Sequence, residues 1–177
     1  MAQHGWYYNM ATIINADTSN GLKLTSDTSG TISLQSAGVD KASIGSTGFI
    51  QSLEKITISA TAATGTINYD TGTQSVVYYT TAATGDWTVN FRHSSGATLN
   101  SKMATGEAIT LVHLVTLTGA EYRNTTVQVD GSSITPEWQG GSAPTEGNAN
   151  SIDSYTYTII KTGDAAFTIL AALVQFA

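Results

Sequence analysis

Apolar and polar residues alternate along much of this chain, which is the pattern of β-strands that bury one face. The clearest case is Ser154–Lys161, where one face carries Tyr155, Tyr157 and Ile159 and the other carries threonines and Ile160. We expect the aromatic face to lie in the core and every earlier strand to pack against it.

Two further segments extend this pattern. Ile109–Leu117 alternates in the same way and sets His113 among apolar residues, which predicts a core or interface histidine with its hydrogen bonds satisfied. Phe167–Phe176 is apolar on both faces, which predicts a central strand or a contact between subunits. The one credible helical turn is Leu99–Thr105, which is followed by Gly106.

Turn signals divide the chain into about eight to ten short strands, an estimate that follows from the spacing of glycine, asparagine and aspartate residues. The sequence therefore predicts an all-β fold, an antiparallel β-sandwich of jelly-roll-like form. Ala62–Gly65 and Ala82–Gly85 both read AATG. We interpret them as two similar hairpin turns, because a repeat architecture needs more copies.

The first part of the chain is thinner in apolar residues than the rest. Gly21–Gly38 has the pattern of a β-hairpin, and Ala42–Gln51 holds only a few apolar residues, Ile44, Phe49 and Ile50, among glycines. Such strands cannot bury a two-sided core. We predict an extended N-terminal arm or stem over residues 1–52 and a β-sandwich domain over residues 53–177.

Composition narrows the classes of partner. Only 11% of the residues are charged, the net charge is −6, and the basic residues are scattered, so we expect no nucleic-acid partner. A soluble monomer usually carries many charges on its surface. The low charge of this chain therefore favours a protein whose surface is partly covered by other subunits. The absence of cysteine excludes disulfides and thiolate metal sites. We expect no membrane span and no signal peptide, because no apolar run is long enough.

No catalytic constellation is visible in the sequence. The histidines His4, His93 and His113 lie in separate segments without metal-ligand spacing. The acidic residues fall mostly at expected turns or strand ends: Asp86, Glu107, Glu121, Asp130, Glu137, Glu146 and Asp153. Their separation in space cannot be read from sequence, so a glycoside hydrolase is kept only as a weak alternative. We predict no enzyme, no cofactor and no metal site.

Two groups of residues are candidates for binding. Trp6, Tyr7 and Tyr8 would be costly to leave in water, which favours an arm that is ordered against a partner. Trp138 lies in a loop among polar side chains, where an indole can stack on a sugar ring. Its alternative role is to plug the end of the sandwich, and we favour that interpretation.

Two stretches resemble a known class of protein. ATIINADTSNGLKLTSDTSGTISLQSAG (11–38) and DGSSITPEWQGGSAPTEGNANSIDSYTYTIIKTG (130–163) are similar to small virion structural proteins of tailed bacteriophages that infect cyanobacteria and other marine bacteria. The MAQHGWYYN prefix departs from that pattern. The resemblance implies a place in the virion, most simply on the capsid exterior.

The resemblance, together with the thin arm, favours a capsid decoration (cement) protein that is a homotrimer. Its partner is the major capsid protein, bound through arm residues Trp6, Tyr7, Tyr8, Ile13, Ile14, Leu22 and Leu24. The alternative is the head of a short tail fibre, in which Trp138 contacts a host surface glycan. A depolymerase is a weaker third interpretation.

Overall fold

The computed structural model describes residues 32–36, 39–45, 48–51 and 56–177, with side chains from residue 56 onward. The chain divides into two compact units, Met1–Leu53 and Glu54–Ala177. This division lies next to the boundary predicted from the sequence. The capsid-binding candidates Trp6, Tyr7, Tyr8, Ile13, Ile14, Leu22 and Leu24 all lie outside the described residues.

The described part of the first unit is an antiparallel sheet of three strands, in the order β1-β2-β3. They are β1 (Ile32–Ser36), β2 (Val39–Gly45) and β3 (Gly48–Gln51). The second strand of the hairpin expected over Gly21–Gly38 corresponds to β1, which pairs with β2. The first strand of that hairpin lies outside the described residues.

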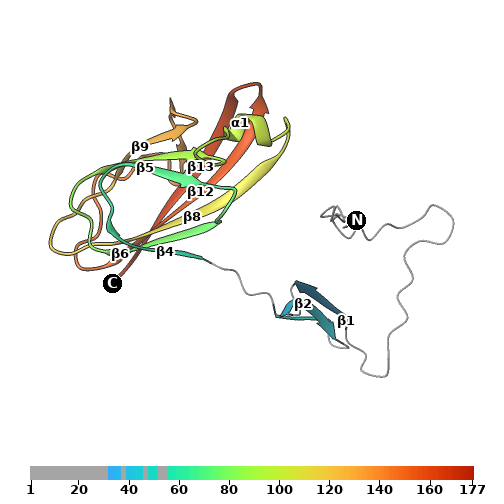
Figure 1. Cartoon of the computed structure of the whole chain (residues 1–177). Coiled ribbons are helices and arrows are strands. Elements are labelled where there is room, and N and C mark those ends of the chain that lie inside the picture. The colour runs from blue at the N-terminus through green and yellow to red at the C-terminus, as the bar shows by residue number, and fades with distance from the viewer. Residues whose placement is uncertain (1–31, 37–38, 46–47, 52–55) are drawn as a thin grey trace, which may run out of the picture. The chain divides into compact units, whose positions relative to one another are not determined.

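The second unit is built from ten strands and one short helix (Figure 1). The strands are β4 (Thr57–Ala62), β5 (Gly65–Asp70), β6 (Val76–Thr81), β7 (Trp87–Arg92), β8 (Ala108–Thr116), β9 (Asn124–Val129), β10 (Ser132–Ile134), β11 (Glu137–Trp138), β12 (Ile152–Gly163) and β13 (Ala166–Phe176). The helix, α1 (Leu99–Lys102), begins at Thr98, whose hydroxyl accepts a hydrogen bond from Ser101 N at 3.2 Å. The all-β prediction and the position of the helical turn are therefore confirmed.

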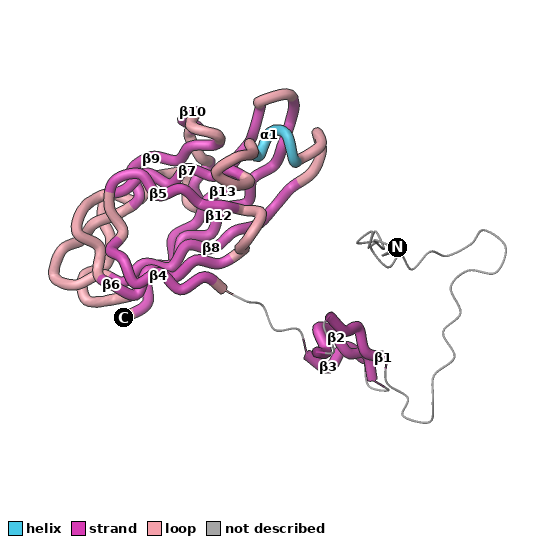
Figure 2. The backbone as a smooth tube through the Cα atoms, in the orientation of Figure 1, coloured by secondary structure: helices cyan, strands magenta, loops and turns pink. Residues whose placement is uncertain are grey.

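These strands form two sheets, with the orders β10-β9-β7-β5 and β11-β13-β12-β8-β6-β4 (Figure 2). From β4 to β9 the chain crosses from one sheet to the other after every strand. We call each consecutive pair, β4–β5, β6–β7 and β8–β9, a coil. Successive coils lie side by side, so β4, β6 and β8 are parallel neighbours, as are β5, β7 and β9.

The purely antiparallel pairing predicted from the sequence is therefore wrong for these strands. A jelly roll is built from antiparallel strands, so the prediction of a jelly-roll-like form is wrong for the same reason. The physical reason is that alternation of apolar residues fixes which face of a strand is buried and does not fix its neighbour. Antiparallel pairs occur between β12 and its neighbours β8 and β13, and between β9 and β10.

The two AATG segments are the corners at which neighbouring coils stack, and their interpretation as hairpin turns is wrong. β4 and β5 belong to different sheets, and the chain crosses between them through Ala63. Thr84 N donates to Ala63 O at 3.2 Å, and Ala83 N donates to Thr116 O at 2.9 Å. β4 pairs with β6 in a register that sets Thr57 opposite Val77. The sequence separation between these two residues equals the separation between the two AATG segments. Small residues suit these corners because the coils approach closely there.

The core lies between the two sheets. The aromatic face predicted for Ser154–Lys161 is confirmed, because Tyr155, Tyr157 and Ile159 are all fully buried. Rings from opposite sheets meet edge to face: Phe91 of β7 contacts Tyr157 at 5.0 Å between centroids, and Trp87 contacts Tyr155 at 5.6 Å.

His113 of β8 lies in this core, as predicted, with no exposed surface. Its ring meets Tyr79 at 5.2 Å and Trp87 at 5.9 Å between centroids, both edge to face. Neither ring nitrogen has a hydrogen-bond partner among the described residues, and Trp87 Nε1 has none either. The prediction that His113 lies in the core is therefore confirmed, and the prediction that its hydrogen bonds are satisfied is wrong.

Candidate functional site

Two backbone contacts, a strand pairing and a hydrogen bond, hold Trp138 at one end of the second unit. β11 pairs in parallel with β13, so that Trp138 lies opposite Ala171, and Gln139 N donates to Ala171 O at 2.7 Å. The chain then turns through Gly140 and Gly141, both with φ of 83°, a conformation that favours glycine. The indole is thereby fixed on the edge of the six-stranded sheet.

The indole is half-buried and packs against the core. Its ring lies 6.4 Å from that of Tyr155 and 6.3 Å from that of Tyr157, edge to face in both cases. These contacts favour the plugging role over a freely presented binding surface. Trp138 also borders three depressions: one of about 710 Å³ towards Pro144 and Leu173, one of about 320 Å³ towards Arg123 and Pro136, and one of about 380 Å³ towards Thr156 and Leu170.

A buried polar cluster lies beneath Trp138. Asn124 Nδ2 donates to Trp87 O at 3.1 Å and to Thr126 O at 2.9 Å, while Asn124 Oδ1 accepts from Tyr157 Oη at 3.2 Å. Asn124 N donates to Tyr155 Oη at 3.4 Å. Burial raises the pKa of both tyrosines well above the ordinary value, so their phenols stay protonated. This cluster ties the two sheets together and has no base to offer to a reaction.

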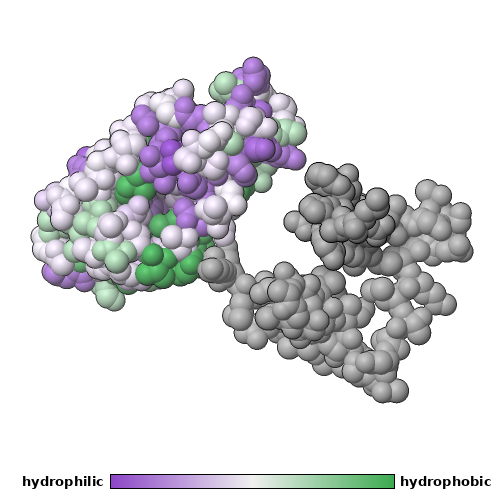
Figure 3. All heavy atoms as spheres, in the orientation of Figure 1, coloured by the Kyte–Doolittle hydropathy of each residue, from purple (hydrophilic) through white to green (hydrophobic). Residues whose placement is uncertain are grey.

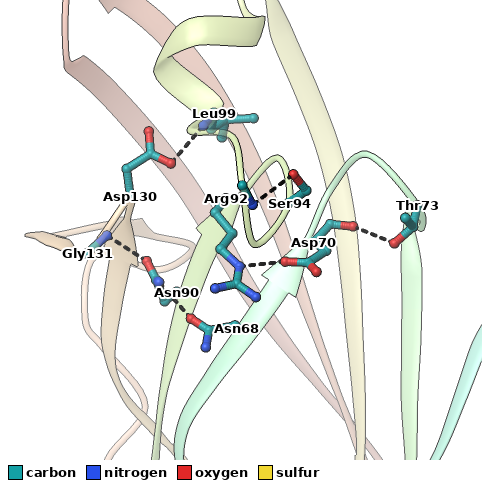
Figure 4. Close-up of polar contacts among 10 residues, drawn as sticks. Asn68, Asp70, Thr73, Asn90, Arg92, Ser94, Leu99, Asp130 and Gly131 are labelled. Atoms are coloured by element: carbon teal, nitrogen blue, oxygen red, sulfur yellow. Dashed lines mark hydrogen bonds and ion pairs between the residues drawn. The ribbon is translucent and has the colours of Figure 1, made fainter.

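A second polar cluster covers the outer face of the four-stranded sheet (Figure 4). Asn90 Nδ2 donates to Asn68 Oδ1 at 2.8 Å, and Asn90 Oδ1 accepts from Gly131 N at 2.8 Å. Arg92 Nε and Asp70 Oδ1 form an ion pair at 2.6 Å, with both side chains partly exposed. These side chains bond to one another, so the cluster fixes the register of three neighbouring strands.

The acidic side chains named from the sequence are used mainly as backbone acceptors. Asp130, at the β9–β10 turn, accepts from Leu99 N at 2.7 Å and Asn100 N at 2.9 Å and so caps α1. Glu107 accepts from Ala104 N, and Asp86 accepts from Arg123 N. These contacts agree with the interpretation that the carboxylates sit at turns and strand ends.

Asp153 differs from the other acidic residues of 56–177 because it is fully buried. Its carboxylate accepts from Asn148 N at 3.2 Å and from Ser151 Oγ at 3.4 Å. Burial raises the pKa of Asp153, and these two hydrogen bonds oppose the rise. No basic side chain forms an ion pair with it among residues 56–177, so its role is to hold the Gly147–Ser151 turn against β12.

Within residues 56–177, no group of three or more histidine, aspartate or glutamate side chains is placed to hold a metal ion. No helix in the described part of the chain is long and apolar enough to cross a membrane. Sequence reasoning pointed to only one strand of a further surface, the uncharged outer face of the six-stranded sheet. Its signal was present in the second apolar face of Phe167–Phe176.

The comparisons with known proteins add no relative. No protein-family model matches the chain, and neither the curated proteins nor the solved structures gave a match.

Proposed function

We propose that this chain is a structural protein of a phage virion, a capsid decoration protein whose N-terminal arm binds the major capsid protein and whose body is a β-sandwich on the capsid exterior. The observation that carries the proposal is the division into two compact units, Met1–Leu53 and Glu54–Ala177, each with its own sheets. One unit can attach to the shell while the other projects from it.

Two tethered units bind a shell better than either does alone. Once the first is attached, the second is held at a high effective concentration beside the same shell, so modest contacts add up. Each contact that buries apolar surface contributes about 25 cal/mol per Å². A protein present in many copies would in this way hold neighbouring capsid subunits together against internal pressure.

The test is the copy number of the chain in purified virions, measured against the major capsid protein by quantitative mass spectrometry. A copy number of the same order as that of the major capsid protein is the expected result. Particles that lack the protein should also lose resistance to heat and osmotic shock. Its absence from the virion, or unchanged particle stability without it, would count against the proposal.

A second candidate function, the head of a short tail fibre, is favoured by Trp138 alone. This residue borders three depressions, as a sugar-stacking residue would. A copy number far below that of the major capsid protein would favour this function.

Trp138→Ala separates stacking on a glycan from plugging. Because the indole packs on Tyr155 and Tyr157, we expect the substitution to lower the free energy of unfolding by about 2 kcal/mol, less than for a fully buried Trp. Denaturant unfolding measures this, with the neighbouring exposed Glu137→Ala as a control that should change little. Binding of the wild-type chain on a glycan array, lost in a folded Trp138→Ala protein, would instead establish a receptor-binding head.

A further inference from the structure

The outer face of the six-stranded sheet carries no charged residue on five of its strands. Even-numbered residues of β6, β8, β12 and β13 point away from the core, since their odd-numbered neighbours are the buried ones. Ile58 of β4 joins this set because its register partner is Tyr78. The other outward positions are valine, leucine, isoleucine, phenylalanine, alanine, serine and threonine. We call this surface the neutral face.

Several large apolar side chains on the neutral face are exposed. Ile58 is 58% exposed, Phe176 56%, Val174 48% and Leu170 47%. Figure 3 shows hydrophobic atoms gathered where Figure 1 places β4 and β6. Exposed apolar side chains on a surface without charge are typical of an interaction site. At the β13 side the exposed Glu137 of β11 lies at the rim of this face, where interfaces tolerate charge.

The neutral face is large enough for a stable interface. Five strands about 4.8 Å apart and about nine residues long at ~3.3 Å per residue give a flat area of ~700 Å². A specific protein interface buries about 800 Å² on each partner. The neutral face alone therefore approaches the size that a stable dimer needs.

The register places two of its exposed apolar residues, Ile58 and Val174, at opposite ends of one row. The row runs from Ile58 through Tyr78 and Leu114 to Ser154 and Val174. A two-fold axis along the strand direction would set Ile58 of one copy on Val174 of the second copy. The same contact would then occur twice, because such an interface uses the same patch on both copies.

We propose that the neutral face is the surface through which two copies of this chain associate, face to face about a two-fold axis. The other broad surface of the unit, over the four-stranded sheet, carries Asp70, Arg92 and Asp130. Packing the neutral face on that surface would bury charges without new partners, which is costly. The surface that best complements the neutral face is therefore the neutral face of a second copy. This pair differs from the homotrimer expected from the sequence.

The test is the mass of the full chain in solution, measured by sedimentation over a range of concentrations. The wild-type chain should sediment at twice its mass of 18.5 kDa. Val174→Lys places a charge in both halves of the pair and should raise its dissociation constant by about 100-fold or more. Thr66→Lys, at an exposed position on the outer side of β5, is the matched control and should leave the pair intact.

Two further measurements keep the proposal open to refutation. Ile58→Lys should also weaken the pair, and circular dichroism and thermal unfolding should show that each variant keeps its fold. Because the neutral face lacks charge, the dissociation constant of the wild-type pair should not rise with salt. A wild-type monomer, a three-copy mass, a salt-sensitive pair, or a pair that survives both lysine substitutions would each overturn the proposal.

Discussion

Lowering the pH from 7 to 4 should remove about 3 kcal/mol from the free energy of unfolding through one side chain, His113. Burial lowers the pKa of His113 from 6.5 to about 3 in the folded chain. Below pH 6.5 the unfolded chain binds a proton at this residue and the folded chain does not. The stability that the neutral imidazole contributes is therefore present above pH 6.5 and is lost as the pH falls towards 3.

The core around His113 offers no compensation for a charged ring. Its neighbours are the aromatic rings of Tyr69, Tyr79 and Trp87, and no carboxylate lies among these contacts. Asp153 acts in the opposite direction, because its raised pKa lets the folded chain take up a proton before the unfolded chain does. The histidine must therefore be isolated by comparison with a variant.

His113→Phe is that variant. Phenylalanine keeps an aromatic ring of similar size and has no nitrogen to leave unpaired, so stability at pH 7 should be unchanged or higher. Urea unfolding at pH 7, 5.5 and 4 should show a much flatter pH dependence than for the wild-type chain. If the two proteins lose stability in parallel as the pH falls, His113 is not the group responsible.

Replacing Gly147 with alanine should lower the free energy of unfolding by about 3 kcal/mol. A Cβ at this position would overlap the backbone carbonyl oxygen of Tyr122 and would lie 2.7 Å from Leu117 Cδ1. Neither neighbour can move easily, because Leu117 is buried and Gly147 N is bonded to Glu121 O at 2.9 Å. The added methyl group would push the loop off Asp153.

Gly119→Ala is the control, since a Cβ there meets nothing within 4 Å. We expect its unfolding midpoint to stay close to that of the wild-type chain, while Gly147→Ala unfolds at a clearly lower denaturant concentration. Equal effects of the two substitutions would show that the close approach at Gly147 is not what the fold requires.

The sequence predicted the faces of the strands well and their neighbours poorly. Alternation placed Tyr155, Tyr157 and His113 in the core, because burial depends only on the face to which a side chain points. The same alternation is compatible with either strand direction. The information about parallel stacking lay in the spacing between the AATG segments, which matches the register of β4 on β6.

The site was predicted only in part for a similar reason. Trp138 was singled out by its loop, and its packing on Tyr155 and Tyr157 agrees with the favoured plugging role. The neutral face as a whole was not predicted, because it is made by five strands whose outer residues become neighbours only after folding. The apolar outer residues of one strand gave a hint, and the absence of charge across all five appears only when their register is known.

The coils end on one side of the unit in β4 of one sheet and β5 of the other, each of which has a single neighbour among the described strands. Each coil pairs mainly with the next coil. An additional coil, inserted in the sequence with the spacing of the AATG segments, would therefore extend both sheets by one strand and leave the existing layers in place. Gene duplication can therefore lengthen this architecture one layer at a time, and relatives of different length would differ in the number of layers.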